Sequence, residues 1–161
     1  MNLKLSALVL AVAGAVSSIP AIAASTTHTL TVSATVTGNC KFNTAGPTTL
    51  TIATGAGVID PSAAGPATGS VGVTFRCTTG VTSAITADDG INSTGPGARR
   101  VYSGSAYMPY SLSMTNAVQA GTGFGAGQDK TVTVDASITA ANYQNAAAGA
   151  YSDTVTLTIT P

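Results

Sequence analysis

The chain has 161 residues, only 7% of them charged, and its six Lys and Arg balance six acidic residues, all of them Asp. This near-neutral balance argues against nucleic acid or a strongly anionic membrane as a partner. Thr, Ser, Ala, Gly and Val dominate a chain with no Trp and a single His, a composition poorly suited to acid–base chemistry.

Residues 1–23 predict a secretory signal peptide. Lys4 precedes an apolar run over residues 5–16, and Ala21-Ile22-Ala23 supplies the small residues of a cleavage site. A membrane anchor is the competing interpretation, but the run is too short to span a bilayer and lacks a charged flank. We therefore expect export without membrane insertion after cleavage, and a mature chain the size of one modest domain.

Residues 26–36 form the first expected strand. Apolar residues alternate there with Thr and Ser, so an extended strand places four of them on one face, in a set we call the comb: Leu30, Val32, Ala34 and Val36. The β-branched residues suit a half-buried strand and disfavour a helix. The segment lies at the expected mature N-terminus, where chains fray unless something holds them. Two outcomes stay open, namely pairing inside its own domain or donation to another copy.

The chain contains two cysteines, Cys40 and Cys77. In an exported protein, an even pair predicts one disulfide. Closing a loop of nearly forty residues stabilises a fold by roughly 4 kcal/mol in the chain-entropy model. A zinc site is the alternative, but two thiols and one distant His make a poor ligand set. We therefore predict a disulfide and no metal.

The rest of the chain alternates in short runs that are separated by turn residues. The expected strands lie, in order, over residues 49–52, 71–77, 81–85, 99–102, 110–114, 132–138 and 154–160. Loops are expected over residues 55–69, 91–98 and 121–127, a turn at Asp88-Asp89-Gly90, and a short helical turn within residues 142–149. This pattern predicts an all-β sandwich and argues against disorder.

Four apparent functional motifs are weak. Residues 121–126 fit a permissive G-x-G-x-x-A nucleotide fingerprint, but a β run follows where a helix is needed. The single histidine, His28, lies on an exposed strand that could not hold a catalytic base in place. Asp88-Asp89 is better explained as a turn than as paired carboxylates or calcium ligands, and Asn92-Ser93-Thr94 is a glycosylation sequon that matters only in a eukaryotic secretory pathway. The sequence predicts no enzyme and no cofactor.

Four pieces of the mature chain together resemble the spore coat U domain, the family that includes subunits of archaic chaperone–usher pili. They are the alternating strand that leads to Gly38-Asn39-Cys40, the run 71–77, the run 110–114, and residues 149–159. The last piece is the most specific, because it follows the family's G-x-Y-x-D-x-V-x-V-x-V closely. One departure is the ending Thr160-Pro161, where family members often finish on an aromatic residue.

The resemblance implies an immunoglobulin-like β-sandwich, residues 38–161, that lacks its final strand. Residues 24–37 are then a donor strand whose comb fills the groove of the next subunit by β-augmentation. Three residues would form the edge of that acceptor groove, where a periplasmic chaperone binds before assembly: Val155, Leu157 and Ile159.

The implied function is that of a structural shaft subunit in an extracellular, cell-surface pilus that contributes to adhesion and biofilm formation. Its partners would be other copies or sibling pilins, the periplasmic chaperone and an outer-membrane usher. Two alternatives stay open. One is a spore or cell-surface coat protein outside any pilus. The other is a carbohydrate-binding module or an enzyme, for which Tyr102, Tyr107 and Tyr110 would be the exposed aromatic residues.

Overall fold

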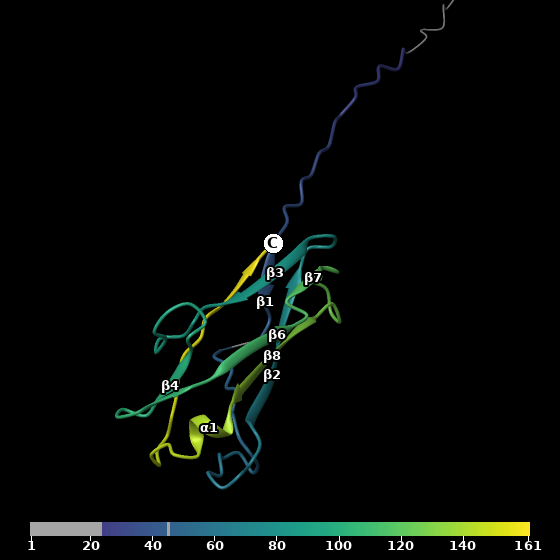
Figure 1. The fold of residues 1–161 in the computed structure, drawn as a ribbon. Coiled ribbons are helices and arrows are strands. Elements are labelled where there is room, and N and C mark those ends of the chain that lie inside the picture. The colour runs from purple at the N-terminus through teal and green to yellow at the C-terminus, as the bar shows by residue number, and fades with distance from the viewer. Residues whose placement is uncertain (1–23, 45) are drawn as a thin grey trace, which may run out of the picture. The chain divides into compact units, whose positions relative to one another are not determined.

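The computed structural model describes residues 24–44 and 46–161 (Figure 1). The expected signal peptide, residues 1–23, lies outside the described residues. The chain divides into two units, Met1–Ala34 and Thr35–Pro161. In the described part of the first unit, all residues are exposed and none is assigned to a helix or strand. No helix among the described residues is long and apolar enough to cross a membrane.

The second unit is built from antiparallel sheets and one short helix, α1 (Ala140–Tyr143). The largest sheet has the order β1 (Cys40–Phe42), β2 (Ala67–Cys77), β8 (Lys130–Ile138) and β6 (Ser111–Thr115). A second sheet has the order β7 (Val118–Ala120), β3 (Thr82–Ala87) and β9 (Leu157–Thr160), and a hairpin pairs β4 (Arg100–Tyr102) with β5 (Tyr107–Pro109).

The longest pairing joins β2 to β8, the two strands with the clearest alternation in the sequence. Their register runs from Ala67 opposite Ile138 to Phe75 opposite Lys130. Val73 and its partner Val132 are buried, whereas the neighbouring pair of Thr74 and Thr131 faces outward. Alternate burial of this kind stabilises a sheet that has one face in the core. The predicted strands over residues 71–77 and 132–138 are confirmed.

The predicted disulfide is also confirmed. Cys40 and Cys77 are directly opposite each other across β1 and β2, and their sulfur atoms are bonded. The bond closes a loop of 37 residues in sequence separation and fixes the start of the sandwich to its longest strand.

The buried residues form two separate clusters. The disulfide core contains Cys40, Val73, Phe75, Cys77, Ile85, Val132 and Val134, and brings the large sheet together with β3. The helix core contains Ala67, Val101, Met108, Ile138 and Tyr143, and brings the other end of β2 and β8 together with the β4–β5 hairpin and α1. Antiparallel sheets that face each other with these buried residues between them make an immunoglobulin-like sandwich, so the predicted all-β class is confirmed.

Some elements differ from the sequence prediction. Residues 48–52 form no strand, because their backbone has no ladder partner and pairing begins only with the bridge of Ala53 to Thr68. β5 and β7 were not predicted, since each has three residues and a weak pattern. The ladder of β9 begins at Leu157, later than the expected residue 154, and α1 begins at Ala140, just before the expected turn.

Candidate binding groove

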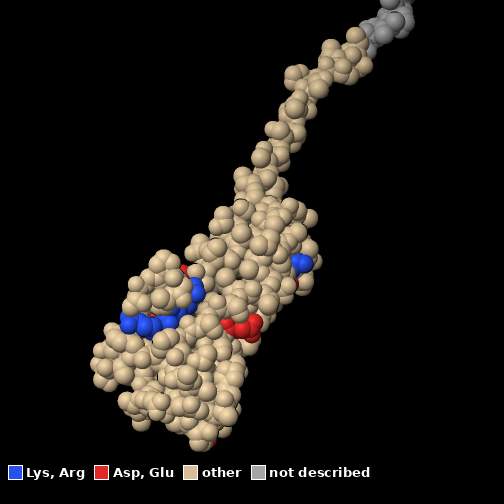
Figure 2. All heavy atoms as spheres, in the orientation of Figure 1, with Lys and Arg blue, Asp and Glu red and all other residues tan. Residues whose placement is uncertain are grey.

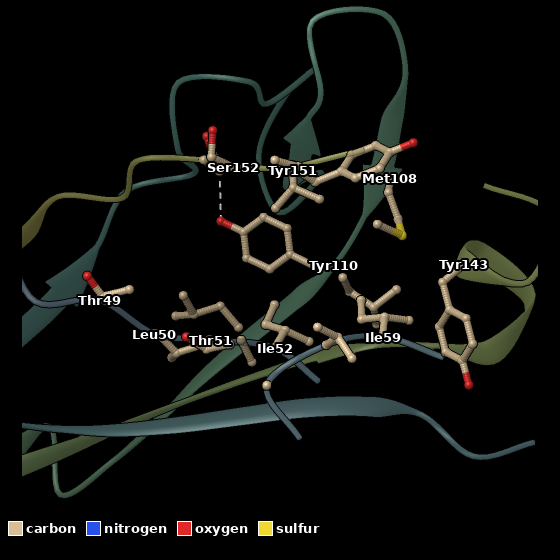
Figure 3. A pocket seen from close by; sticks show the side chains of 18 of the residues that line it. Thr49, Leu50, Thr51, Ile52, Ile59, Met108, Tyr110, Tyr143, Tyr151 and Ser152 are labelled. Atoms are coloured by element: carbon tan, nitrogen blue, oxygen red, sulfur yellow. Dashed lines mark hydrogen bonds between the residues drawn. The ribbon is translucent and has the colours of Figure 1, made fainter. Parts of the chain in front are cut away.

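A cavity of about 980 Å³ opens between the large sheet and the segment that leads into β9 (Figure 3). This volume is at the upper end of the range for small-molecule sites, about 300–1,000 Å³. Its walls are mainly apolar, and come from the large sheet, from residues 48–52, from the helix core and from the β9 segment: Leu50, Ile52, Val71, Val73, Val101, Met108, Leu112, Val134, Ala136, Ile138, Val155 and Leu157.

The cavity lies where the two cores fail to meet. Val155 and Ala136 line it without belonging to either core. Val73 and Val134 of the disulfide core and Val101 and Met108 of the helix core line it as well. Apolar surface on both sides of a gap favours the entry of further apolar side chains.

One wall of the cavity is a strand segment with an unpaired edge. Along residues 151–160, half-buried residues alternate with exposed ones. The exposed, even-numbered residues of this segment make its backbone hydrogen bonds to the rest of the chain. Ser152 exchanges bonds of 2.8 and 3.0 Å with Tyr102, Thr154 accepts from Ile91 N at 3.1 Å, and Thr156 accepts from Asp88 N at 3.0 Å.

The alternation of an antiparallel ladder turns the intervening backbone groups to the opposite edge. The residues concerned are Tyr151, Asp153, Val155, Leu157 and Ile159. Within the described chain, β9 pairs with β3 alone, and no strand is hydrogen-bonded to the other edge of these five residues. The first four also line the cavity. This edge therefore offers backbone donors and acceptors beside an apolar hollow, which is the geometry that accepts an added strand.

A hydrogen-bonded bridge spans this cavity. The hydroxyl of Tyr110 donates to Asp153 Oδ2 at 2.8 Å, and Figure 3 shows its ring reaching into the cavity toward this bond. Asn92 donates to Asp153 Oδ1 from its backbone N at 3.2 Å and from Nδ2 at 3.1 Å. Burial and the bond to Asp153 raise the pKa of Tyr110, so the phenol stays protonated and remains a donor.

The bridge depends on a glycine. Gly90 has φ +79, and a Cβ atom there would lie 2.0 Å from Asp153 Oδ2. A side chain at this position would therefore displace the carboxylate that binds Tyr110. Next to it, Asp88 accepts from Gly90 N at 3.0 Å and from Thr156 N at 2.9 Å, and these bonds lower the pKa of Asp88. The predicted turn at residues 88–90 thus holds the β9 segment in place.

The structure places the predicted acceptor residues unequally. Val155 and Leu157 line the cavity, whereas Ile159 packs against the disulfide core and does not line it. The predicted donor residues are exposed, with exposed fractions of 79% for Leu30, 84% for Val32 and 83% for Val36, and Ala34 is exposed as well. No strand is assigned to residues 24–39, and their role as a donor stays a prediction.

The sequence prediction missed the polar part of the wall. Tyr151 and Asp153 share the odd-numbered face of Val155, so the same alternation could have found them. Tyr110 could not have been found in this way, because it is 43 residues from Asp153 in sequence. Leu50 and Ile52 were predicted as strand residues, and the structure shows them as half-buried lining of the cavity instead.

Among the described residues that line the cavity, Asp153 alone is charged, and Figure 2 shows the charged side chains gathered in a few patches on a mostly uncharged face. Within residues 24–44 and 46–161, no group of three or more His, Cys, Asp or Glu is arranged to hold a metal ion. Tyr102 and Tyr107 stack on each other with ring centroids 4.5 Å apart, and the guanidinium of Arg100 lies 4.0 Å from the Tyr107 centroid. These contacts cover part of the ring surface on which a sugar would stack.

Comparisons with known proteins give two findings. The family model of the Spore Coat Protein U domain matches residues 26–158. Among solved structures, the chain is similar to a chain in the CsuC–CsuE chaperone–tip adhesion subunit pre-assembly complex from the archaic chaperone–usher Csu pili of Acinetobacter baumannii. The identity is 16% and the TM-score 0.48, over 78% of this chain and 40% of that chain. This chain thus spans less than half the length of that one. No curated protein matched the chain.

Proposed function

The chain belongs to the Spore Coat Protein U domain family, and from this premise we propose that it is a structural, non-enzymatic subunit of an extracellular pilus. In this proposal the chain is exported through the periplasm, where a chaperone covers its groove. An outer-membrane usher then assembles the subunits head to tail, and the fibre contributes to adhesion and biofilm formation.

The observation that carries this proposal is the cavity beside the unpaired edge of residues 151–159. A strand added at this edge makes ladder hydrogen bonds and places alternate side chains in the cavity. The comb has the required alternation. Burying Leu30, Val32 and Val36 contributes on the order of 1.5–3 kcal/mol each, and Ala34 contributes less.

Residues 48–52 support the same proposal from the opposite side of the cavity. They are assigned to no helix or strand, and Leu50 and Ile52 line the cavity. Their alternation is that of a strand, although they have no ladder partner in the structure. We propose that the incoming strand supplies this partner, so that it pairs with residues 151–159 on one side and with residues 48–52 on the other.

Donation between copies leads to a fibre. Thr37 O accepts a bond of 3.4 Å from Thr78 Oγ1, and Cys40 is held by the disulfide, so the donor segment ends where its own sandwich begins. A contact that joins the segment of one copy to the groove of the next is heterologous, and it builds a filament when it does not close into a ring.

The test compares the unmodified exported chain with a deletion of residues 26–36 and with Val32→Asp. We expect the unmodified chain to form fibres by electron microscopy and SDS-gel ladders that collapse only on boiling. Both variants should remain disulfide-bonded monomers, because a carboxylate cannot enter the apolar cavity unpaired. The matched control is Ser33→Asp, which lies on the opposite face and should still polymerise. Fibres from the deletion variant would show that this segment is not the donor.

A surface coat protein outside any pilus is the second candidate, because the matched family is named after a spore coat protein. A coat layer held by lateral contacts would assemble without residues 26–36 and would give no heat-sensitive ladder. The same experiment therefore separates the two functions.

A further inference from the structure

We propose that the Tyr110–Asp153 bridge sets the orientation and register of the incoming strand, by leaving room only for the small side chain of Ala34 of a second copy. This inference rests on the proposed function, since it assumes that the comb enters the groove. It adds a specificity determinant that is built from two residues of the groove wall.

Face alternation alone cannot select the register. A slip of one residue would turn the comb away from the cavity, but a slip of two residues keeps it inside. Four residues of the unpaired edge line the cavity, Tyr151, Asp153, Val155 and Leu157, and the comb also has four residues. Full overlap of the two sets leaves one antiparallel and one parallel arrangement.

The two arrangements differ in what meets the bridge. The antiparallel one places Ala34 opposite Asp153 and Val32 opposite Val155. The parallel one exchanges these positions, so that Val32 meets Asp153 and Ala34 meets Val155.

We infer that the groove offers less room at the first of these positions than at the second. At Asp153, the ring of Tyr110 reaches into the cavity and the carboxylate is fixed by Asn92 (Figure 3). At Val155, the wall borders the gap that neither core fills. The smallest comb residue therefore fits at the bridge, and a larger one fits the gap. Size complementarity selects the antiparallel arrangement, which is also the more stable kind of pairing.

Cysteine cross-linking tests the register directly. Because the odd-numbered residues of the edge point toward the incoming strand, opposed residues form close pairs with Cα atoms about 5.5 Å apart, a spacing that a disulfide spans. A slip of two residues separates them to about 7–8 Å. Full-length chains with Val155→Cys are assembled with chains that carry one of four donor changes: Leu30→Cys, Val32→Cys, Ala34→Cys or Val36→Cys.

We expect a cross-link to Val155→Cys from Val32→Cys and from none of the other three. A cross-link from Ala34→Cys would indicate the parallel arrangement or an antiparallel register slipped by two residues, and one from Leu30→Cys or Val36→Cys would indicate another register. Each of these results would overturn the inference while leaving strand donation intact. The absence of any cross-link, together with the absence of heat-sensitive ladders from the unmodified chain, would instead remove the proposed function itself.

A size exchange tests the role of Tyr110. Ala34→Leu should reduce polymer yield by about tenfold or more, because overpacking a filled site is unfavourable. The matched control is Thr35→Leu, which adds a large apolar side chain on the opposite face and should leave the yield unchanged. Tyr110→Ala should restore assembly of the Ala34→Leu chain.

This rescue distinguishes a role of Tyr110 in specificity from a purely structural role. If Tyr110 were only structural, Tyr110→Ala would lower the polymer yield of both the unmodified chain and the Ala34→Leu chain. Normal assembly of the Ala34→Leu chain, or no rescue by a folded Tyr110→Ala chain, would contradict the inference. If Tyr110→Ala prevents folding, the donor changes and the cross-links still decide, because all of them keep Tyr110 in place.

Discussion

The disulfide core and the helix core are built on the same two strands, β2 and β8, but the structures that cover them differ. Over the disulfide core lie β3 and β9, and β1 is tied to β2 by a covalent bond. Over the helix core lie a hairpin of two three-residue strands and a helix of four residues. Paired strands therefore cover one end of the sandwich and mainly loops cover the other. The cavity opens between the disulfide core and the helix core.

This difference indicates how the stability is distributed. Strands β2 and β8 hold each other over a long ladder, whereas Tyr143 secures the helix core by donating its hydroxyl to the backbone oxygens of Ala63 and Gly65. Elements with short ladders and many loop contacts open at lower free energy than long central strands. We therefore expect the helix core to open first when the groove is empty.

The largest effect should come from breaking the disulfide core. Replacing both Cys40 and Cys77 by Ala should lower the free energy of unfolding by about 2–5 kcal/mol, since the loop is no longer closed in the unfolded chain. Thermal unfolding followed by circular dichroism measures the change. An unchanged melting temperature would mean that the β2–β8 ladder holds this half without the bond.

Filling the groove should reduce the contrast between the two cores. A synthetic peptide of residues 26–36, added to the monomeric full-length chain at 100 times its Kd, should stabilise it by about 2.7 kcal/mol. Hydrogen exchange should then slow at residues 48–52 and 151–159, and in the helix core. A peptide with Val32→Asp is the control and should protect nothing. If exchange slowed in the helix core but not at residues 48–52 and 151–159, the peptide would be binding outside the groove.

A smaller effect is expected from Tyr143→Phe, which removes one hydroxyl from the helix core. The carbonyl of Ala63 keeps the bond from Gln144 Nε2 at 3.1 Å, and Gly65 is exposed, so the cost should be that of one ordinary hydrogen bond, about 0.5–1.5 kcal/mol. Hydrogen exchange should become faster in residues 140–146 and remain unchanged in β2 and β8 next to the disulfide. Equal acceleration in both regions would show that the two cores unfold as one unit.

The smallest effect is expected from acid. Bonds from Thr156 N and Gly90 N lower the pKa of Asp88, and the bond from Arg76 lowers the pKa of Asp129. A carboxyl whose folded pKa is depressed stabilises the fold above its unfolded pKa, near 3.9, and this contribution is lost as the pH falls through the folded value. The melting temperature should therefore be flat from pH 7 to about pH 5 and fall below about pH 4. Asp88→Asn should reduce this fall, and a fall that begins near pH 6 would point to another group.

The sequence predicted those parts of the fold that alternation and composition determine. The strands β2 and β8 followed from their period of two residues, and the disulfide followed from an even cysteine pair in an exported chain. Residues 48–52 show the limit of this reasoning, because alternation reports which way side chains face and not whether a neighbouring strand exists. β5 and β7 have too few residues to show a period.

The candidate groove was predicted in part. Val155 and Leu157 were identified by family resemblance and lie in the wall, whereas Ile159 contributes to the disulfide core. The bridge of Tyr110 to Asp153 was not foreseen, because it joins positions that only the folded chain brings together. Burial and polar partners of this kind depend on tertiary contacts, which a single sequence does not reveal.

The mainly apolar lining of the groove has a consequence for the salt dependence of the proposed assembly. In the proposed assembly, a contact made of ladder hydrogen bonds and mainly apolar side chains offers dissolved ions little to screen. The strength of this contact should therefore change little with the salt concentration of the surrounding water.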